Sequence, residues 1–302
     1  MRQAISRLGA SLTRRYPFLS GRGTIANSRL LRLIFPPVRA DAWCLVHGRR
    51  FLAPLDDYVG RAAFYLGDLD PKLSKIAKLV VRDGDTVLDI GANLGLLTVL
   101  FSNLVGSAGR VLAFEPNPRV LERLRRTVGE PGGENVEVFP FALGSQEGEL
   151  ELWVPGDNLG MGSLVHNHGR TASEGVARVS VRVLDDVLAG SGVVSIRLVK
   201  IDVEGFEAHV LRGAERCLRE VRPHVILFEM NDPVPPGRHE VPLMLAAADY
   251  ALYSITKSYT RLRFEEVDLK SEQRPGSHDY IAIAPGPPRA EVMASLGIAA
   301  VR

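Results

Sequence analysis

The chain is poor in cysteine, in net charge and in long apolar runs, and each shortage excludes a class of protein. Two cysteines among 302 residues, Cys44 and Cys217, cannot build a disulfide framework or a cysteine-based metal site. A net charge of only +2 gives no reason to expect a nucleic-acid partner. No stretch approaches the ~18 apolar residues of a membrane-spanning helix. We therefore expect a cytoplasmic protein without a transmembrane segment.

The first 40 residues contain no acidic side chain. They carry eight arginines, at positions 2, 7, 14, 15, 22, 29, 32 and 39. No apolar core of a signal peptide lies among them, so residues 1–40 are interpreted as a basic arm. One hypothesis places the arm on an anionic membrane surface, with the apolar residues between Leu30 and Phe35 entering the lipid. The alternative is a partly ordered arm without a dedicated role.

A buried strand followed by a glycine turn and a helix is the main feature that the chain does contain. Residues 86–90 are mostly apolar, Asp89 to Gly95 read Asp-x-Gly-x-Asn-x-Gly, and apolar residues then follow at helical spacing. Gly91 and Gly95 would let the backbone turn sharply and approach a ligand that any Cβ would push away. N–H groups that open the next helix would point into the same space. The pattern predicts a site for an adenosine-bearing molecule beside Asp89.

The spacing of the glycines favours one such molecule. The motif Gly-x-Gly-x-x-Gly is typical of dinucleotide-binding sites. In this chain, by contrast, three residues separate Gly91 from Gly95, and an acid precedes them. A pyrophosphate needs bare N–H groups away from negative charge, but a sulfonium cation with an amino group tolerates the acid. The turn therefore favours S-adenosylmethionine over NAD. A tight turn that binds nothing stays open as an alternative.

A second predicted strand ends in Glu115, at the distance from Asp89 where α/β nucleotide folds place the acid that binds ribose hydroxyls. The competing interpretation is a carboxylate near the start of the helix over residues 118–128. Asn117, between two prolines, is expected to be free to form hydrogen bonds. A third strand within residues 135–144 should bring Phe141 or Ala142 close to the adenine.

Other segments complete the expected organisation. A hairpin is predicted within residues 43–66, followed by a helix that Asp70 caps and Pro71 opens. Residues 149–154 and 180–183 predict inserted strands, and the glycine- and histidine-rich residues 156–178 predict a loop over the site. His166 and His168 in that loop could serve as a base or, together with an acid, as a soft-metal site, and the simpler alternative is that they are polar loop residues.

A fourth predicted strand ends in two carboxylates, Asp202 and Glu204. Residues two apart on a strand share a face unless the turn begins between them. We expect Asp202 to hold the methionine end of the donor and Glu204 to face the acceptor as a general base. The alternative for Glu204 is a solvated carboxylate at a helix start, and Lys200 is expected to pair with one of the acids. A fifth strand ends in Glu229, followed by Asn231 and Asp232, so Mg²⁺ between the two strand ends is a weaker hypothesis.

Three blocks in this order resemble the FkbM-type methyltransferases: Val87–Gly95, Ala113–Asn117 and Lys200–Glu207. The resemblance covers roughly residues 45–285, and the block Lys-Ile-Asp-Val-Glu-Gly is its most specific part. It implies an α/β, class I methyltransferase (Rossmann-like) fold, with a seven-stranded, mostly parallel sheet flanked by helices. It also implies O-methylation, often of sugars or secondary metabolites. The basic arm has no counterpart in the family pattern.

These observations predict a basic arm (1–40), an N-terminal hairpin and helix (41–85), a catalytic domain (86–285) and a C-terminal tail (286–302). The predicted function is S-adenosylmethionine-dependent O-methylation of a sugar, glycolipid or secondary metabolite. The alternatives are an NAD-dependent oxidoreductase and a non-catalytic S-adenosylmethionine-binding module. The acceptor and the oligomeric state stay open. Cofactor binding is assigned to Asp89, Gly91, Ala92, Asn93, Gly95, Glu115, Asn117, Ala142 and Asp202, and catalysis to Asp202 and Glu204, with no metal site assigned.

Overall fold

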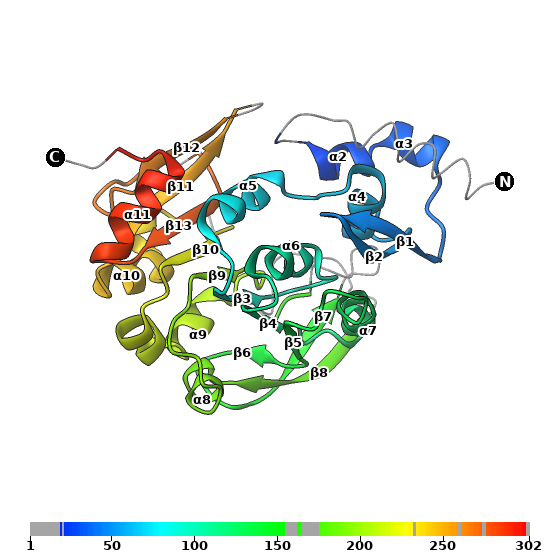
Figure 1. The fold of residues 1–302 in the computed structure, drawn as a ribbon. Helices are drawn as coiled ribbons and strands as arrows, with labels where there is room; N and C mark the ends of the chain where they lie inside the picture. Colours follow the sequence, from blue (N-terminus) through cyan, green and yellow to red (C-terminus); the bar gives the residue numbers. More distant parts are fainter. Residues whose placement is uncertain are drawn as a thin grey trace.

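In the computed structural model, a central β-sheet lies between layers of helices, with a small β-hairpin at one end (Figure 1). The structure describes residues 19, 21–154, 162–164, 175–231, 234–258, 261–273 and 276–299. The central sheet has the strand order β12-β11-β13-β10-β9-β3-β4-β5. Its strands are β3 (Thr86–Ile90), β4 (Arg110–Phe114), β5 (Val136–Phe139), β9 (Leu198–Ile201), β10 (Val225–Glu229), β11 (Ala251–Lys257), β12 (Leu262–Glu266) and β13 (Asp279–Ile283).

The sheet confirms the predicted seven-stranded, mostly parallel arrangement and adds an eighth strand. Strands β5, β4, β3, β9 and β10 pair in parallel, and β13 runs antiparallel between β10 and β11. The sequence did not predict β12, which pairs antiparallel with β11 at the edge. Because β12 is an edge strand with largely exposed side chains, it lacks the continuous apolar run that marks the buried strands.

Helices cover both faces of the sheet. One face carries α8 (Leu184–Ala189), α9 (Glu207–Arg212), the π-helix over 217–221, a 3₁₀ turn over 236–238 and α10 (Glu240–Ala247). The other face carries α5 (Pro71–Val80), α6 (Leu96–Val105) and α11 (Pro287–Leu296), and α7 (Pro118–Val128) packs beside β4 and β5. Val292 and Met293 of α11 are buried in the core, so this part of the predicted tail packs on the sheet.

The N-terminal part packs onto the same body. It consists of α2 (Arg22–Ala26), α3 (Arg29–Ile34), β1 (Asp41–Val46), β2 (Arg49–Pro54) and α4 (Tyr58–Leu66). The predicted hairpin is confirmed for β1 and β2, but its second half is helix α4, because Asp57 accepts hydrogen bonds from two N–H groups of the first turn. Asp70 caps α5 as predicted. No helix in the described part of the chain has the length and apolar character needed to span a bilayer.

A separate three-stranded sheet, ordered β6-β8-β7, lies beside β5. It consists of β6 (Ala142–Leu143), β7 (Gly148–Val154) and β8 (Gly175–Arg182). The inserted strands are therefore confirmed, but β8 begins before residue 180, so residues 175–178 are strand rather than loop. His166 and His168 lie outside the described residues, as does most of the predicted loop.

Candidate functional site

Two cavities open where the parallel strands β3, β4, β9 and β10 end. The space within them, including the part open to solvent, is about 630 and 990 Å³. The first extends toward β4 and the inserted sheet, and the second toward α4, α5 and β10. Gly91, Asn93 and Asp202 line both, so the cavities meet at the turn after β3. Open α/β sheets bind ligands at this end of their strands.

The glycines of this turn have a left-handed backbone and make the sharp turn that the sequence predicts, but neighbouring protein atoms give a further reason for glycine. Gly91 has φ +78°, and a Cβ there would lie 2.0 Å from the carbonyl oxygen of Asp202. Gly95 has φ +87°, and its Cβ would lie 2.6 Å from a methyl carbon of Leu124. At both glycines the space that a Cβ would occupy is taken by protein atoms, whereas the sequence predicts a ligand there. Among the described lining residues Gly95 is absent from both cavities, whereas Ala92 lines the second.

Asp89 lies behind the turn instead of beside the ligand space. Its side chain is fully buried, and it is not among the described residues that line either cavity. One carboxylate oxygen accepts a 2.6 Å hydrogen bond from Thr98 Oγ1, and the other lies 3.4 Å from Lys200 Nζ. The predicted contact of Asp89 with a cofactor stays a prediction, and in the structure its carboxylate contacts Lys200 and Thr98 of α6.

Lys200 links the two central strands. Its Nζ donates a 2.6 Å hydrogen bond to the carbonyl oxygen of Gly91 and lies 3.6 Å from Asp202 Oδ2. Burial alone would lower the pKa of Lys200, but the carboxylates of Asp89 and Asp202 raise it above its ordinary value. The prediction that Lys200 pairs with a strand-end acid is confirmed, with Asp89 as a second partner.

Glu115 lines the first cavity and is held by the backbone. Its Oε2 accepts a 2.7 Å hydrogen bond from the N–H of Asn93, and its Oε1 accepts one of 2.8 Å from Asn117. Burial raises the pKa of Glu115 to about 7, although these hydrogen bonds act against the rise. Asn117 also lines the cavity, but its side chain is not free, because it caps α7 by accepting the N–H of Arg119.

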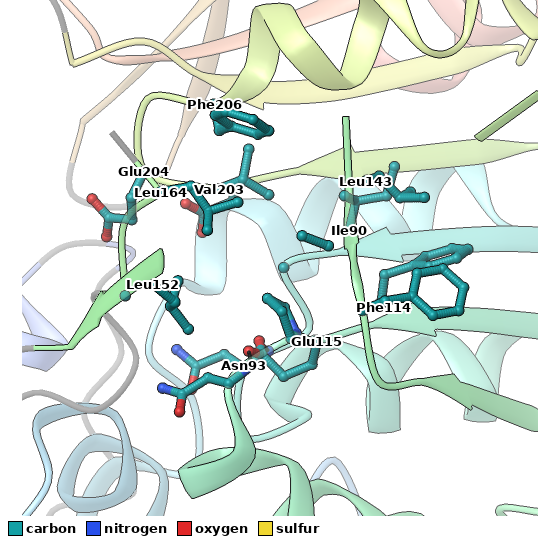
Figure 2. Close-up of a pocket in the computed structure, with 17 residues that line it drawn as sticks. Ile90, Asn93, Phe114, Glu115, Leu143, Leu152, Leu164, Val203, Glu204 and Phe206 are labelled. Atoms are coloured by element: carbon teal, nitrogen blue, oxygen red, sulfur yellow. Dashed lines mark hydrogen bonds between the residues drawn. The ribbon is translucent and has the colours of Figure 1, made fainter. Parts of the chain in front are cut away.

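Apolar side chains line much of the first cavity around Glu115 (Figure 2). The central sheet contributes Phe114, and β6 and β7 contribute Ala142, Leu143 and Leu152. Phe206, stacked on the ring of His209, closes another side. Ala142 and Phe141 line the same cavity as Glu115, and their closeness to an adenine stays a prediction. The inserted sheet supplies a wall of the site, which no local pattern indicated.

Asp202 and Glu204 do not share a face as a strand would require. Strand β9 ends at Ile201, and Glu204 has φ +54°, so the turn begins before the second acid. Asp202 lies at the junction of the cavities with its side chain 42% exposed. Glu204 lines only the first cavity, opposite Glu115 (Figure 2). The expectation that Glu204 faces the acceptor stays a prediction, and in the structure Glu204 shares its cavity with Glu115.

The second cavity contains a carboxylate that the sequence suggested only as a metal ligand. Glu229 ends β10, next to Asp279 on β13 and one strand away from Asp202. Burial raises the pKa of Glu229 to about 8, with further contributions from Asp202 and Asp279. Lys72 forms an ion pair with Asp279 and supports this wall. Asp279 was not predicted as a site residue, because it lies far along the chain from the motifs.

The Mg²⁺ hypothesis gains no support. No group of three or more metal-binding side chains occurs within the part of the chain that the structure describes. Asp232, which the hypothesis included, lies outside that part.

The fold and site together define an α/β protein of the class I methyltransferase type, with a Rossmann-like sheet and strand-end carboxylates around its ligand space. The chain belongs to the FkbM methyltransferase family: the model of the methyltransferase FkbM domain matches residues 89–252, more than half of the chain. The match includes Asp89, Glu115 and Glu229, and it ends before β12 and β13.

Individual relatives are more distant. The chain is 26% identical to the hexuronic acid methyltransferase AglP of Haloferax volcanii over 155 residues, covering 51% of this chain and 59% of the relative. It is 27% identical to the 2-O-methyltransferase NoeI of Sinorhizobium fredii (49% and 65% covered). It is 32% identical to the 31-O-demethyl-FK506 methyltransferase FkbM of Streptomyces tacrolimicus (45% and 61%). The chain thus spans about three fifths of the length of these curated relatives.

A solved structure of methyltransferase FkbM from Methylobacillus flagellatus KT is also similar. It has 15% sequence identity and a TM-score of 0.40, covering 74% of this chain and 53% of the other.

Proposed function

We propose that this protein transfers a methyl group from S-adenosylmethionine to a hydroxyl oxygen of a sugar, a glycolipid or a secondary metabolite. The observation that carries the proposal is the pair of cavities that meet at Asp202. One has the chemistry to bind an adenosine, and the other has acidic groups suited to a hydroxyl acceptor. Membership of the FkbM family favours a methyl donor over NAD. The names of AglP and NoeI support a sugar hydroxyl as the acceptor.

The residues of the first cavity fit the donor. Glu115 presents carboxylate oxygens, which can accept hydrogen bonds from both ribose hydroxyls, and Phe114, Ala142 and Phe206 offer apolar surface to an adenine. Asp202, at the junction, has the charge to bind the ammonium group of the methionine end. S-Adenosylmethionine would supply a methyl carbon attached to a positively charged sulfur. Holding acceptor and donor in line is worth up to ~7–11 kcal/mol of the barrier.

A hydroxyl acceptor must also lose its proton. Glu229 lines the second cavity, and its raised pKa makes it a stronger base than an ordinary carboxylate once it is ionised. We assign it the proton-accepting role, with Glu204 as the second candidate. A positioned base contributes roughly 10²–10⁴-fold to the rate.

The charge of the second cavity restricts the acceptor. Its described lining contains four carboxylates (Asp70, Asp202, Glu229 and Asp279) but only two lysines. Lys200 is engaged by Asp89 and Asp202, and Lys72 pairs with Asp70 and Asp279 behind the lining. Lys257 near the surface adds a further positive charge, so the described carboxylates of this region still outnumber its lysines. A neutral or amine-bearing sugar hydroxyl suits this surface better than a carboxylate-bearing one, because like charges repel.

Isothermal titration with S-adenosylmethionine tests the donor site. Glu115→Ala should weaken binding at least about tenfold, because hydrogen bonds to a charged group are lost. Glu122→Ala, on the exposed face of α7, is the matched control and should bind like the parent. Absence of binding by the parent, or equal binding by Glu115→Ala, would overturn the proposal.

Acceptor chemistry is tested with the same donor carrying a labelled methyl group. Methyl glucoside, methyl glucosaminide and methyl glucuronide differ mainly in charge, and we expect label on the first two in excess of the third. Preferred labelling of the glucuronide would contradict the assigned acceptor class without affecting the donor site.

A further inference from the structure

We propose that helix α3 and the arginines around it dock this protein onto an anionic lipid bilayer. The inference is independent of the proposed methyl transfer, since it concerns a surface outside both cavities. It develops the hypothesis that the basic arm contacts membranes, using side-chain positions that the sequence alone could not supply.

Helix α3 presents an apolar stripe to solvent. Leu30, Leu33 and Ile34 have the spacing i, i+3, i+4 and lie on one side of the helix. They are 67%, 80% and 55% exposed, which is unusual for three large apolar side chains on so short a helix. Leu31 and Phe35 face the other way and pack against the core formed by β1, β2 and α4. The stripe is therefore held outward by a helix that is anchored to the body.

Positive charge accompanies this stripe along the chain. Arg29 and Arg32 lie on the same helix and are exposed, and Arg39 follows on an exposed segment. Residues 1–40 contain no acidic side chain, so no carboxylate of the segment itself neutralises these arginines. Apolar side chains that enter the acyl boundary, flanked by cations at headgroup level, are the arrangement of interfacial helices. Juxtamembrane arginines are attracted to anionic leaflets. We therefore assign a lipid surface to this face in preference to a protein partner.

Helix α3 lies at the same end of the molecule as α2 and α4 (Figure 1). Helix α2 precedes α3 and packs against α4. A Cβ on Gly23 of α2 would lie 3.0 Å from Leu69, which lines the second cavity together with Val59 of α4. A bilayer bound at α3 would therefore lie near the wall of the cavity assigned to the acceptor.

Co-sedimentation of the full chain with vesicles tests this inference. We expect binding to phosphatidylcholine vesicles that contain phosphatidylserine, weaker binding to phosphatidylcholine alone, and loss of binding as salt is raised. The double variant Leu33→Glu/Ile34→Glu should lower the partition coefficient at least about tenfold, since two apolar side chains that would enter the lipid become charged. Arg29→Glu/Arg32→Glu should lose the preference for phosphatidylserine.

A matched control uses Val194, which is 89% exposed and lies between α8 and β9, away from the N-terminal elements. Val194→Glu should bind vesicles like the parent. The inference is overturned if the parent does not sediment with phosphatidylserine vesicles, or if Leu33→Glu/Ile34→Glu and Val194→Glu behave alike. It is also overturned if light scattering shows that the stripe holds two copies of the chain together and vesicles do not bind. Titration with S-adenosylmethionine should give the same affinity for all these variants, which separates this result from the donor site.

Discussion

Lys200 lies opposite Asp89 in the parallel pairing of β9 with β3, and its ammonium group hydrogen-bonds to the carbonyl oxygen of Gly91. One buried cation thus connects two motifs that are far apart in the chain. It compensates the charge of Asp89, which has no contact with solvent, and fixes the turn that both cavities share.

Replacing Lys200 by Met should destabilise the fold strongly. The variant keeps much of the side-chain volume but leaves Asp89 as an uncompensated buried charge, which costs about 3–5 kcal/mol. Urea denaturation measures the change. Lys75→Met, on the exposed side of α5, should shift the free energy of unfolding by less than about 0.5 kcal/mol. The double variant Lys200→Met/Asp89→Asn should recover part of the loss; a strictly additive result would contradict the assigned pairing.

Two glycines with the same backbone conformation should respond differently to alanine. Gly84 and Gly91 have φ +83° and +78°, so alanine costs about 1–2 kcal/mol at either position. A Cβ at Gly84 meets no atom within 4 Å, whereas at Gly91 it collides with the backbone of Asp202. Gly91→Ala should therefore lose roughly 1–3 kcal/mol more than Gly84→Ala in thermal or chemical denaturation. Equal losses would show that the contact with Asp202 relaxes freely.

Binding of S-adenosylmethionine should depend on pH through Glu115. Its pKa of about 7 means that the carboxyl group is largely protonated at pH 6, whereas ribose hydroxyls bind best to the ionised form. Affinity should fall as the pH is lowered from 8 to 6, and binding at pH 7 should release protons. Titration calorimetry in buffers of different ionisation enthalpy measures this release. Glu115→Gln should abolish it, and an unchanged release in that variant would assign the proton to another group.

The raised pKa of Glu115 also makes the free energy of unfolding depend on pH in a defined direction. Because the pKa of Glu115 is higher in the folded chain than its ordinary value of 4.5, the folded state retains the proton more strongly. Its contribution to the free energy of unfolding is greatest below pH 4.5 and falls as the pH rises toward 7. The pH dependence of the unfolding free energy should therefore become flatter over this window in Glu115→Gln.

Turnover should distinguish Glu229 from Glu204 as the base. Because the pKa of Glu229 is about 8, the rate with an accepted sugar should rise with pH up to about that value. Glu229→Gln should lower kcat roughly 10²–10⁴-fold and remove this rise, while S-adenosylmethionine still binds. Glu229→Asp should recover part of the rate. If Glu204→Gln loses turnover and Glu229→Gln does not, the base is Glu204.

Local patterns were sufficient to predict much of the fold. Buried strands such as Thr86–Ile90 have nearly continuous apolar runs. The start of helix α5 is marked by two adjacent residues, the cap Asp70 and the first helical residue Pro71. The edge strand β12 and the helical second half of the predicted hairpin were missed, because exposed or capped segments lack such runs. Helix α11 was assigned to a tail because its burial depends on α5 and β13.

The sequence by itself determined the strand–turn–helix units, the sharp turns at glycines, the acids that end the strands, and the resemblance to a methyltransferase family. These features depend on interactions between residues close in the chain. Only the tertiary structure decided which acids face ligand space: Asp89 is turned inward onto Lys200, Glu204 is turned into the first cavity, and Glu229 and Asp279 meet in the second. Those positions depend on how separate strands pair and where each strand ends, and neighbouring residues in the sequence do not encode either.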